Sequence, residues 1–212
     1  MVMIITVFEY DKEKMTCHKL KKVEEAYKFL KSPILKWINI DGLRKEDVEN
    51  VCHHFGIHPL IAEDILSIGQ RPKMDEIDGL MYCLLNMLSF NEKISGVETK
   101  QVSIILGNNF VISFQEDPFS PLREKFKIAG SKVRQNNADF LFYSLLDYIV
   151  DYYFIVMEKM GVKIELLAED IIKNSNNRSL VKINMIRKEM ILLKRSIAPV
   201  RELMSGILRS ES

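Results

Sequence analysis

Two adjacent carboxylates, Glu63 and Asp64, lie in the short apolar segment HPLIAEDIL. On a helical wheel Asp64 borders the apolar face of this segment. Burying an unpaired charge costs several kcal/mol, so this carboxylate needs a partner. Three partners are open: a capping backbone amide, Arg71 or Lys73 of the QRPK turn that follows, or a bound cation.

A second group of carboxylates begins with Asp147 and Asp151, inside the apolar run FLFYSLLDYIVDYYFIVM. Carboxylates four residues apart on a helix repel each other unless something positive lies between them. One interpretation is therefore that Asp147 and Asp151 face a cation. The other is that an acidic helix pairs with a basic helix in an antiparallel hairpin. The acidic ridge comprises Asp147, Asp151, Glu158, Glu165 and Glu169, and the basic row comprises Arg187, Lys194 and Arg201, flanked by Lys188 and Arg195.

The segment CHHFGIH has the residue types of a zinc site but the wrong spacing. Cys52, His53 and His54 point in different directions from one helix, whereas zinc ligands lie a turn apart or across a tight knuckle. We expect surface histidines here, with His58 as an N-terminal helix cap.

Composition excludes several classes of function. The 212 residues are 47% apolar and carry a net charge of +1, which gives no bulk field to attract nucleic acid. Three cysteines at irregular spacing, without an N-terminal signal segment, predict reduced thiols in the cytosol. No phosphate-binding glycine loop, nucleophile motif or zinc-protease motif is present, so we expect no enzyme.

The helices and strands that must position these residues follow a pattern that changes along the chain. Up to about residue 133 the pattern predicts strands and helices in alternation, and beyond it only helical periodicity. The longest apolar run could reach across a bilayer, but each of its two aspartates opposes insertion by about 2.5–3.5 kcal/mol, so we expect a buried soluble helix. The predicted strands are 3–10, 15–20, 35–40, 79–90, 98–107 and 110–115, and the predicted helices are 23–31, 45–55, 59–66, 135–172 and 179–209, the last two joined by the turn NSNNRS.

This order predicts an α/β fold with a mixed β-sheet sandwiched by helices, followed by a long antiparallel helical hairpin. The domains are 1–133 and 134–212. In the second long helix a heptad seam runs from Ile183 to Ile207, and we expect a bend at Pro199. The seam should leave apolar surface at its C-terminal end, so that Val200, Met204 and Ile207 are not all fully buried.

Five segments together resemble the cytoplasmic region of the CorA family of magnesium transporters. They are WINIDG, HPLIAEDIL, QRPK, FQE and YSLLDYIVDYYF, in this order, and the resemblance covers nearly the whole chain. It implies a homopentamer whose two membrane spans follow a stalk helix after residue 212. The chain would then be a soluble fragment at the cytoplasmic face of the membrane, with neighbouring subunits and the membrane as partners and no nucleic acid.

The resemblance also implies a metal site and a role. Glu63, Asp64 and Asp147 match the ligands of a regulatory Mg²⁺ that binds between subunits and holds the channel closed, and a stalk aspartate that completes the site is absent here. The function implied is that of the divalent-cation-sensing domain of a Mg²⁺ transporter, also for Co²⁺ or Ni²⁺. Two alternatives stay open: a zinc-transporting member of the superfamily, and a free-standing helical scaffold that uses the heptad seam.

Overall fold

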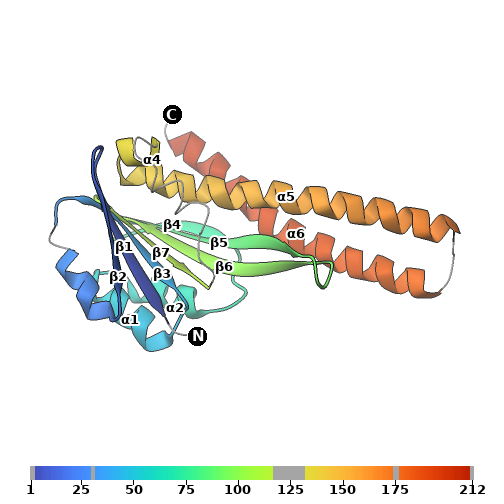
Figure 1. Ribbon diagram of the computed structural model, residues 1–212, viewed down its shortest axis with the longest axis horizontal. Helices are drawn as coiled ribbons and strands as arrows, with labels where there is room; N and C mark the ends of the chain where they lie inside the picture. Colours follow the sequence, from blue (N-terminus) through green and yellow to red (C-terminus); the bar gives the residue numbers. More distant parts are fainter. Residues whose placement is uncertain (1–2, 30–31, 117–131, 174–176, 211–212) are drawn as a thin grey trace. The chain divides into compact units, whose positions relative to one another are not determined.

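The first half of the chain contains a seven-stranded mixed sheet (Figure 1). The computed structural model describes residues 3–29, 32–116, 132–173 and 177–210, with the helical backbone alone for 177–178 and 204–210. The strands are β1 (Ile4–Tyr10), β2 (Met15–Leu20), β3 (Leu35–Asp41), β4 (Lys73–Ile77), β5 (Leu80–Asn91), β6 (Gly96–Leu106) and β7 (Phe110–Gln115). Their order in the sheet is β2-β1-β3-β7-β6-β5-β4. The central pair β3 and β7 is parallel, while β1–β2, β1–β3, β4–β5 and β6–β7 are antiparallel.

Helices complete the α/β architecture, which confirms the predicted fold class. They are η1 (Val23–Phe29), α1 (Lys45–His54), α2 (Pro59–Leu66), α4 (Lys132–Gln135), α5 (Ala138–Lys173) and α6 (Asn177–Ser210). One local element was missed. The stretch after Arg71 and Pro72 forms an additional strand, β4, which was not predicted, whereas the helix predicted from Val23 is present as a 3₁₀ helix. Part of the predicted NSNNRS turn lies outside the described residues.

The core lies on the face of the sheet that η1, α1 and α2 cover. Ile38, Ile40 and Phe114 point to this face and are fully buried. Because β3 and β7 are buried on both faces, their remaining side chains also need partners. On the opposite face Trp37 Nε1 donates to Ser113 Oγ at 2.9 Å, and this bond links the two parallel strands. The register that brings Trp37 opposite Val111 is thus fixed by packing on one face and polar contacts on the other.

A buried lysine donates hydrogen bonds to carbonyl oxygens at and just after the end of η1. The Lys36 amine donates to the carbonyl oxygens of Phe29 at 2.9 Å and Ser32 at 2.6 Å. Burial lowers the pKa of Lys36, because desolvation penalises the charged form, and Glu9 opposes this shift. A cation at the C-terminal end of a helix also satisfies carbonyls that lack an intrahelical partner.

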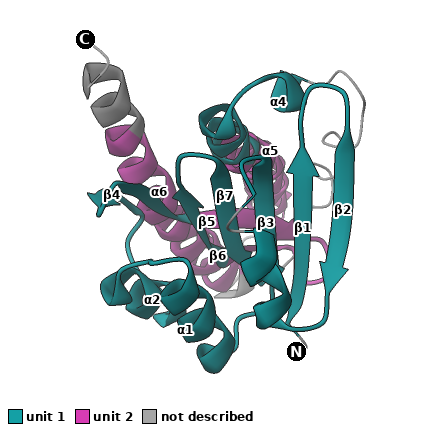
Figure 2. Cartoon of the chain, turned by 90° about the vertical axis from the view of Figure 1, so that its left-hand side faces the viewer, with its two compact units in different colours: residues 1–85, 100–148 teal, residues 86–99, 149–212 magenta. Residues whose placement is uncertain are grey.

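The chain divides into two compact units (Figure 2). Unit 1 comprises Met1–Leu85 and Lys100–Tyr148, and unit 2 comprises Asn86–Thr99 and Ile149–Ser212. Unit 2 thus contains the β5–β6 tip, most of α5 and all of α6. Within it the Tyr153 hydroxyl donates to the Asn86 carbonyl at 2.6 Å, which ties α5 to β5. The predicted boundary at residue 133 stays a prediction.

Helix α5 buries one face rather than most of its surface. Leu141, Leu145 and Ile149 are fully buried, whereas Phe154 and Met157 are exposed. By length and composition α5 could also cross a membrane. This is weak evidence for a membrane span, because core helices of soluble proteins have the same length and composition. The apolar run is thus only in part the buried helix that we expected.

The seam on α6 is exposed at its start and buried further on. Ile183 and Met190 are exposed, whereas Leu193 and Val200 are buried at 4% exposure each. The side chains of Met204 and Ile207 lie outside the described residues, so the predicted apolar surface at the C-terminal end of the seam stays a prediction. The helix continues through Pro199, and the predicted bend stays a prediction.

Candidate metal site

Helix α2 presents the adjacent carboxylates. Pro59 occupies its first turn, where the missing N–H does no harm, and His58 Nδ1 accepts from the backbone N–H of Leu60 at 3.2 Å. The predicted cap at His58 is confirmed. Ile61 and Ile65 anchor the helix in the core of unit 1, with at most 2% of either residue exposed.

The C-terminal end of α2 is tied to the sheet. Gln101 Nε2, on β6, donates to the carbonyl oxygens of Asp64 at 3.0 Å and Ile65 at 3.2 Å. The backbone beneath Asp64 is thus fixed by a side chain far away in sequence. No local pattern marks Gln101 for this role, so sequence reasoning missed it.

Asp64 has an internal partner. Its Oδ2 lies 2.5 Å from Lys73 Nζ, and the side chains of Asp64 and Lys73 are 17% and 37% exposed. Of the three partners left open by the sequence, a basic side chain after the helix is the one observed. Strand β4 begins at Lys73 and brings this amine to the helix. The charge of Asp64 is therefore compensated within the chain.

Glu63, by contrast, is exposed to solvent. Within the described part of the chain its carboxylate has neither an ion pair nor a hydrogen bond. Both of its oxygens are available to a cation or to another molecule.

Asp147 is the third predicted ligand, on the part of α5 that belongs to unit 1. It is exposed between the buried Leu146 and Tyr148. Asp151, one turn further, is also exposed, and neither aspartate has an ion pair with any described residue. No group of three or more acidic, histidine or cysteine side chains that could hold a metal occurs among the described residues, so Asp147 does not join Glu63 and Asp64 in one cluster.

Among the described residues, Asp147, Asp151, Glu158 and Glu165 of the acidic ridge form no ion pair with Arg187 or Lys194 of the basic row, so this part of the hairpin interpretation is not confirmed. Other side chains join the helices: Lys163 Nζ contacts both carboxylate oxygens of Glu189 at 2.8 and 2.9 Å, and Lys182 Nζ lies 2.7 Å from Asp170. In the ridge itself only Glu169 has a described ion-pair partner, Lys173 on the same helix.

The histidines of CHHFGIH lie at the surface, as expected. His53 and His54 are exposed, and the His54 ring stacks on Tyr27 with ring centroids 3.5 Å apart. Cys52 is buried, and burial raises the pKa of its thiol to about 12, which disfavours the thiolate that binds metal.

The available donors suit a hard cation. Glu63 and Asp147 offer carboxylate oxygens at the surface, and Asp64 has one oxygen, Oδ1, outside its contact with Lys73. Mg²⁺ keeps most of its waters and takes only one or two carboxylates, so a shallow site at a surface suffices for it. These carboxylates are therefore the ligand type that Mg²⁺ takes.

The chain is similar in sequence and fold to known proteins. Residues 33–212 match the family model described as CorA-like Mg²⁺ transporter protein. The chain is 35% identical over 209 residues to the cobalt/magnesium transport protein CorA of Thermotoga maritima, covering 97% of this chain and 60% of that protein. It thus spans less than two thirds of that relative's length.

Two solved structures share the fold. The soluble domain of CorA from Methanocaldococcus jannaschii is 18% identical with a TM-score of 0.69, over 93% of this chain and 76% of that one. The cytoplasmic domain of ZntB from Vibrio parahaemolyticus is 16% identical with a TM-score of 0.65, over 100% and 82%.

Proposed function

This chain belongs to the family of CorA-like Mg²⁺ transporters, and from that premise we propose that it is the cytosolic cation-sensing domain of a divalent-cation transporter. The transporter is a homo-oligomer, a pentamer by family resemblance, and this part lies at the cytoplasmic face of the membrane. The regulatory ligand is Mg²⁺, and the transported ions include Mg²⁺ and Co²⁺ or Ni²⁺.

The observation that carries the proposal is the exposure of Glu63 and Asp147, whose carboxylates form no ion pair with any described residue. Asp64, in contrast, is paired with Lys73 within the chain. Two of the three residues that match the family's ligands are thus exposed.

The mechanism follows from repulsion between carboxylates. Two carboxylates brought about 4 Å apart across a subunit boundary repel by about 4 kcal/mol at an effective dielectric constant near 20. A cation shared between them removes this repulsion and adds attraction. Subunits in the closed assembly are therefore held together when the cation is abundant, and separate when it is scarce.

Zinc transport is the second candidate, because the ZntB cytoplasmic domain shares the fold. The donors argue for a hard cation: Glu63, Asp64 and Asp147 offer only oxygen, whereas zinc sites typically use histidine or cysteine. A sensor built from these residues should respond to Mg²⁺ at concentrations where oxygen ligands suffice.

The experiment is a cation titration of the 212-residue chain. We expect Mg²⁺ binding, measured by calorimetry, to weaken at least tenfold when Glu63→Gln and Asp147→Asn are combined, because charge count is a main determinant of affinity for hard cations. Glu13→Gln, at an exposed position in the β1–β2 turn, is the matched control and should leave binding unchanged.

Unchanged Mg²⁺ binding in the combined variant would contradict the sensing proposal. Tighter binding of Zn²⁺ than of Mg²⁺ that depends on the same carboxylates would favour the second candidate. Because one chain alone offers few carboxylates to a hard cation, the titration should extend into the millimolar range.

A further inference from the structure

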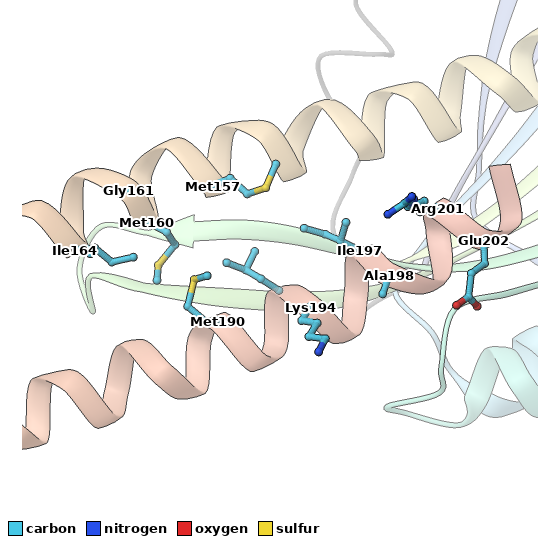
Figure 3. Close-up of a pocket in the computed structure, with 11 residues that line it drawn as sticks. Met157, Met160, Gly161, Ile164, Met190, Lys194, Ile197, Ala198, Arg201 and Glu202 are labelled. Atoms are coloured by element: carbon cyan, nitrogen blue, oxygen red, sulfur yellow. The ribbon is translucent and has the colours of Figure 1, made fainter. Parts of the chain in front are cut away.

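An apolar groove runs between α5 and α6 within unit 2 (Figure 3). Its volume of about 900 Å³ lies in the range of small-molecule sites, about 300–1,000 Å³. Met157, Ile164 and Met190 are 40–46% exposed although they line it. Apolar surface left open in this way marks a place where another molecule binds. The apolar wall comes from both helices: Met157, Met160 and Ile164 on α5, and Met190, Leu193 and Ile197 on α6.

The two helices are held together beside the groove. Lys163 Nζ, on α5, contacts both carboxylate oxygens of Glu189, on α6, at 2.8 and 2.9 Å. Gly161, two residues before Lys163, lines the groove, and nothing lies within 4 Å of a Cβ built on it. Open space therefore reaches the backbone of α5 next to a contact that fixes the helices.

The wall of the groove suits a flexible apolar chain. Three of its side chains are methionines, and the unbranched methionine side chain adapts its shape to different apolar partners. On α6 the lining residues extend from Met190 to Arg201, which is about 16 Å along a helix. The groove is therefore elongated and apolar over most of its length. An extended alkyl chain matches both properties.

Three charged residues line the groove, all on α6: Lys194, Arg201 and Glu202. Figure 3 shows Arg201 extending toward α5, whereas Lys194 and Glu202 extend away from it. Among the described residues of α5, no acidic side chain lines the groove. A guanidinium is always charged and binds a carboxylate through two parallel hydrogen bonds. The end of the groove at Arg201 therefore suits an anionic group.

We propose that this groove binds a fatty acid, with its alkyl chain along the methionines and its carboxylate at Arg201. Burial of the chain removes apolar surface of both molecules from water, which supplies most of the affinity. Arg201 determines the direction in which the chain lies. Since the apolar wall borders one elongated space, a phospholipid would leave one of its two chains in water. This site goes beyond the proposed function and uses none of the carboxylates Glu63, Asp64 and Asp147.

Filling the groove tests the position of the alkyl chain. We expect the 212-residue chain to bind one decanoate, measured by calorimetry in EDTA. Gly161→Leu places a side chain in the groove and should weaken this binding at least tenfold, because the ligand then meets an occupied space. Ala168→Leu, at an exposed position of α5 that does not line the groove, is the matched control and should leave binding unchanged. Leucine is a good helix former, so both variants should keep the helical circular dichroism.

Removing the cation tests the position of the carboxylate. Arg201→Gln should weaken decanoate binding about tenfold, because a hydrogen bond to a charged group contributes about 1.5–3 kcal/mol. The same variant should bind the neutral 1-decanol as the unchanged chain does. Arg187→Gln, which removes an exposed arginine of α6 outside the groove, should leave the binding of both ligands unchanged.

Three results would overturn the proposal. The first is no saturable decanoate binding up to its micelle concentration, and the second is decanoate binding that neither Gly161→Leu nor Arg201→Gln weakens. The third is binding to phosphatidylglycerol vesicles without binding to decanoate, which would assign the groove to a membrane surface. All measurements are made in EDTA, so a failure here leaves the Mg²⁺ titration to decide on cation sensing.

Discussion

At the scale of single residues, Lys73 decides how much negative charge the end of α2 presents. Its amine lies 2.5 Å from Asp64 and 3.9 Å from Asp75. It therefore offsets the negative charge of Asp64, the residue that follows Glu63. The pair is partly exposed and adds little to stability. Its larger effect is electrostatic, because any cation that approaches Asp64 also approaches Lys73.

Replacing Lys73 should therefore strengthen cation binding. We expect Lys73→Met to raise the Mg²⁺ affinity about tenfold, since a single positive charge about 5 Å from a divalent ion costs roughly 1.7 kcal/mol even at the dielectric constant of water. Calorimetric titration of the 212-residue chain measures this change. Lys45→Met, which removes an exposed lysine paired with Glu49, serves as the control. A weaker affinity in Lys73→Met would show that the amine orients Asp64 for the ion rather than competing with it.

At the scale of elements, the sequence predicted most strands and helices but not β4. The strand KMDEI is short, charged and at the edge of the sheet, so it lacks the alternation of apolar residues by which a half-buried strand is recognised. Its partner β5 is longer and mostly apolar, and was predicted. Pairing with β5, which no local pattern encodes, makes KMDEI a strand.

The β6–β7 turn offers a test of packing at this scale. A Cβ on Gly107 would lie 2.4 Å from the ring of Phe110, which packs against Phe55. We expect Gly107→Ala to lower the free energy of unfolding by about 1–3 kcal/mol, because the partly buried ring must leave its place against the core. Urea unfolding followed by circular dichroism measures the loss.

Gly161 on α5 is the matched control. Nothing lies within 4 Å of a Cβ added there, and alanine is the better helix former by about 1 kcal/mol. Gly161→Ala should therefore stabilise the chain, and Gly107→Ala combined with Phe110→Leu should recover part of the loss. Equal effects of the two alanine substitutions would exclude the steric explanation.

At the scale of the whole molecule, the sequence located the candidate ligands but not their surroundings. Glu63 and Asp147 were recognisable by resemblance, and their exposure could be expected for ligands shared with another subunit. The contact of Asp64 with Lys73 depends on β4, and the support from Gln101 depends on sheet pairing, so neither could be settled from spacing alone. Long-range pairing, rather than helix periodicity, limited the prediction of the site.

Two buried thiols should lower the free energy of unfolding at alkaline pH. Burial raises the pKa of both Cys52 and Cys83 from 9.0 to about 12. The folded chain therefore keeps protons that the unfolded chain loses above pH 9, and the free energy of unfolding should fall by about 1.4 kcal/mol per pH unit for each thiol between pH 9 and 12. Below pH 9 this contribution is fully present.

Urea unfolding at pH 8 and pH 10 checks this dependence. Cys83→Ala should reduce the loss between the two pH values by the share of one thiol, whereas Cys17→Ser, at an exposed position, should leave it unchanged. A loss that is the same in Cys83→Ala would assign the alkaline sensitivity to other buried groups, such as Tyr10 and Tyr82, whose pKa values burial also raises.

The parallel pairing of β3 with β7 has a consequence for how the chain is made. β3 ends at Asp41 and β7 begins at Phe110, so the ribosome must add all the intervening residues before the central strand finds its second neighbour. At about 5–20 residues per second this takes several seconds, during which one edge of β3 stays unpaired. Ile38 and Ile40 lack their neighbours on β7 for the same period. The nascent chain should therefore be most prone to aggregation, and most in need of chaperones, after β3 has emerged and before β7 has.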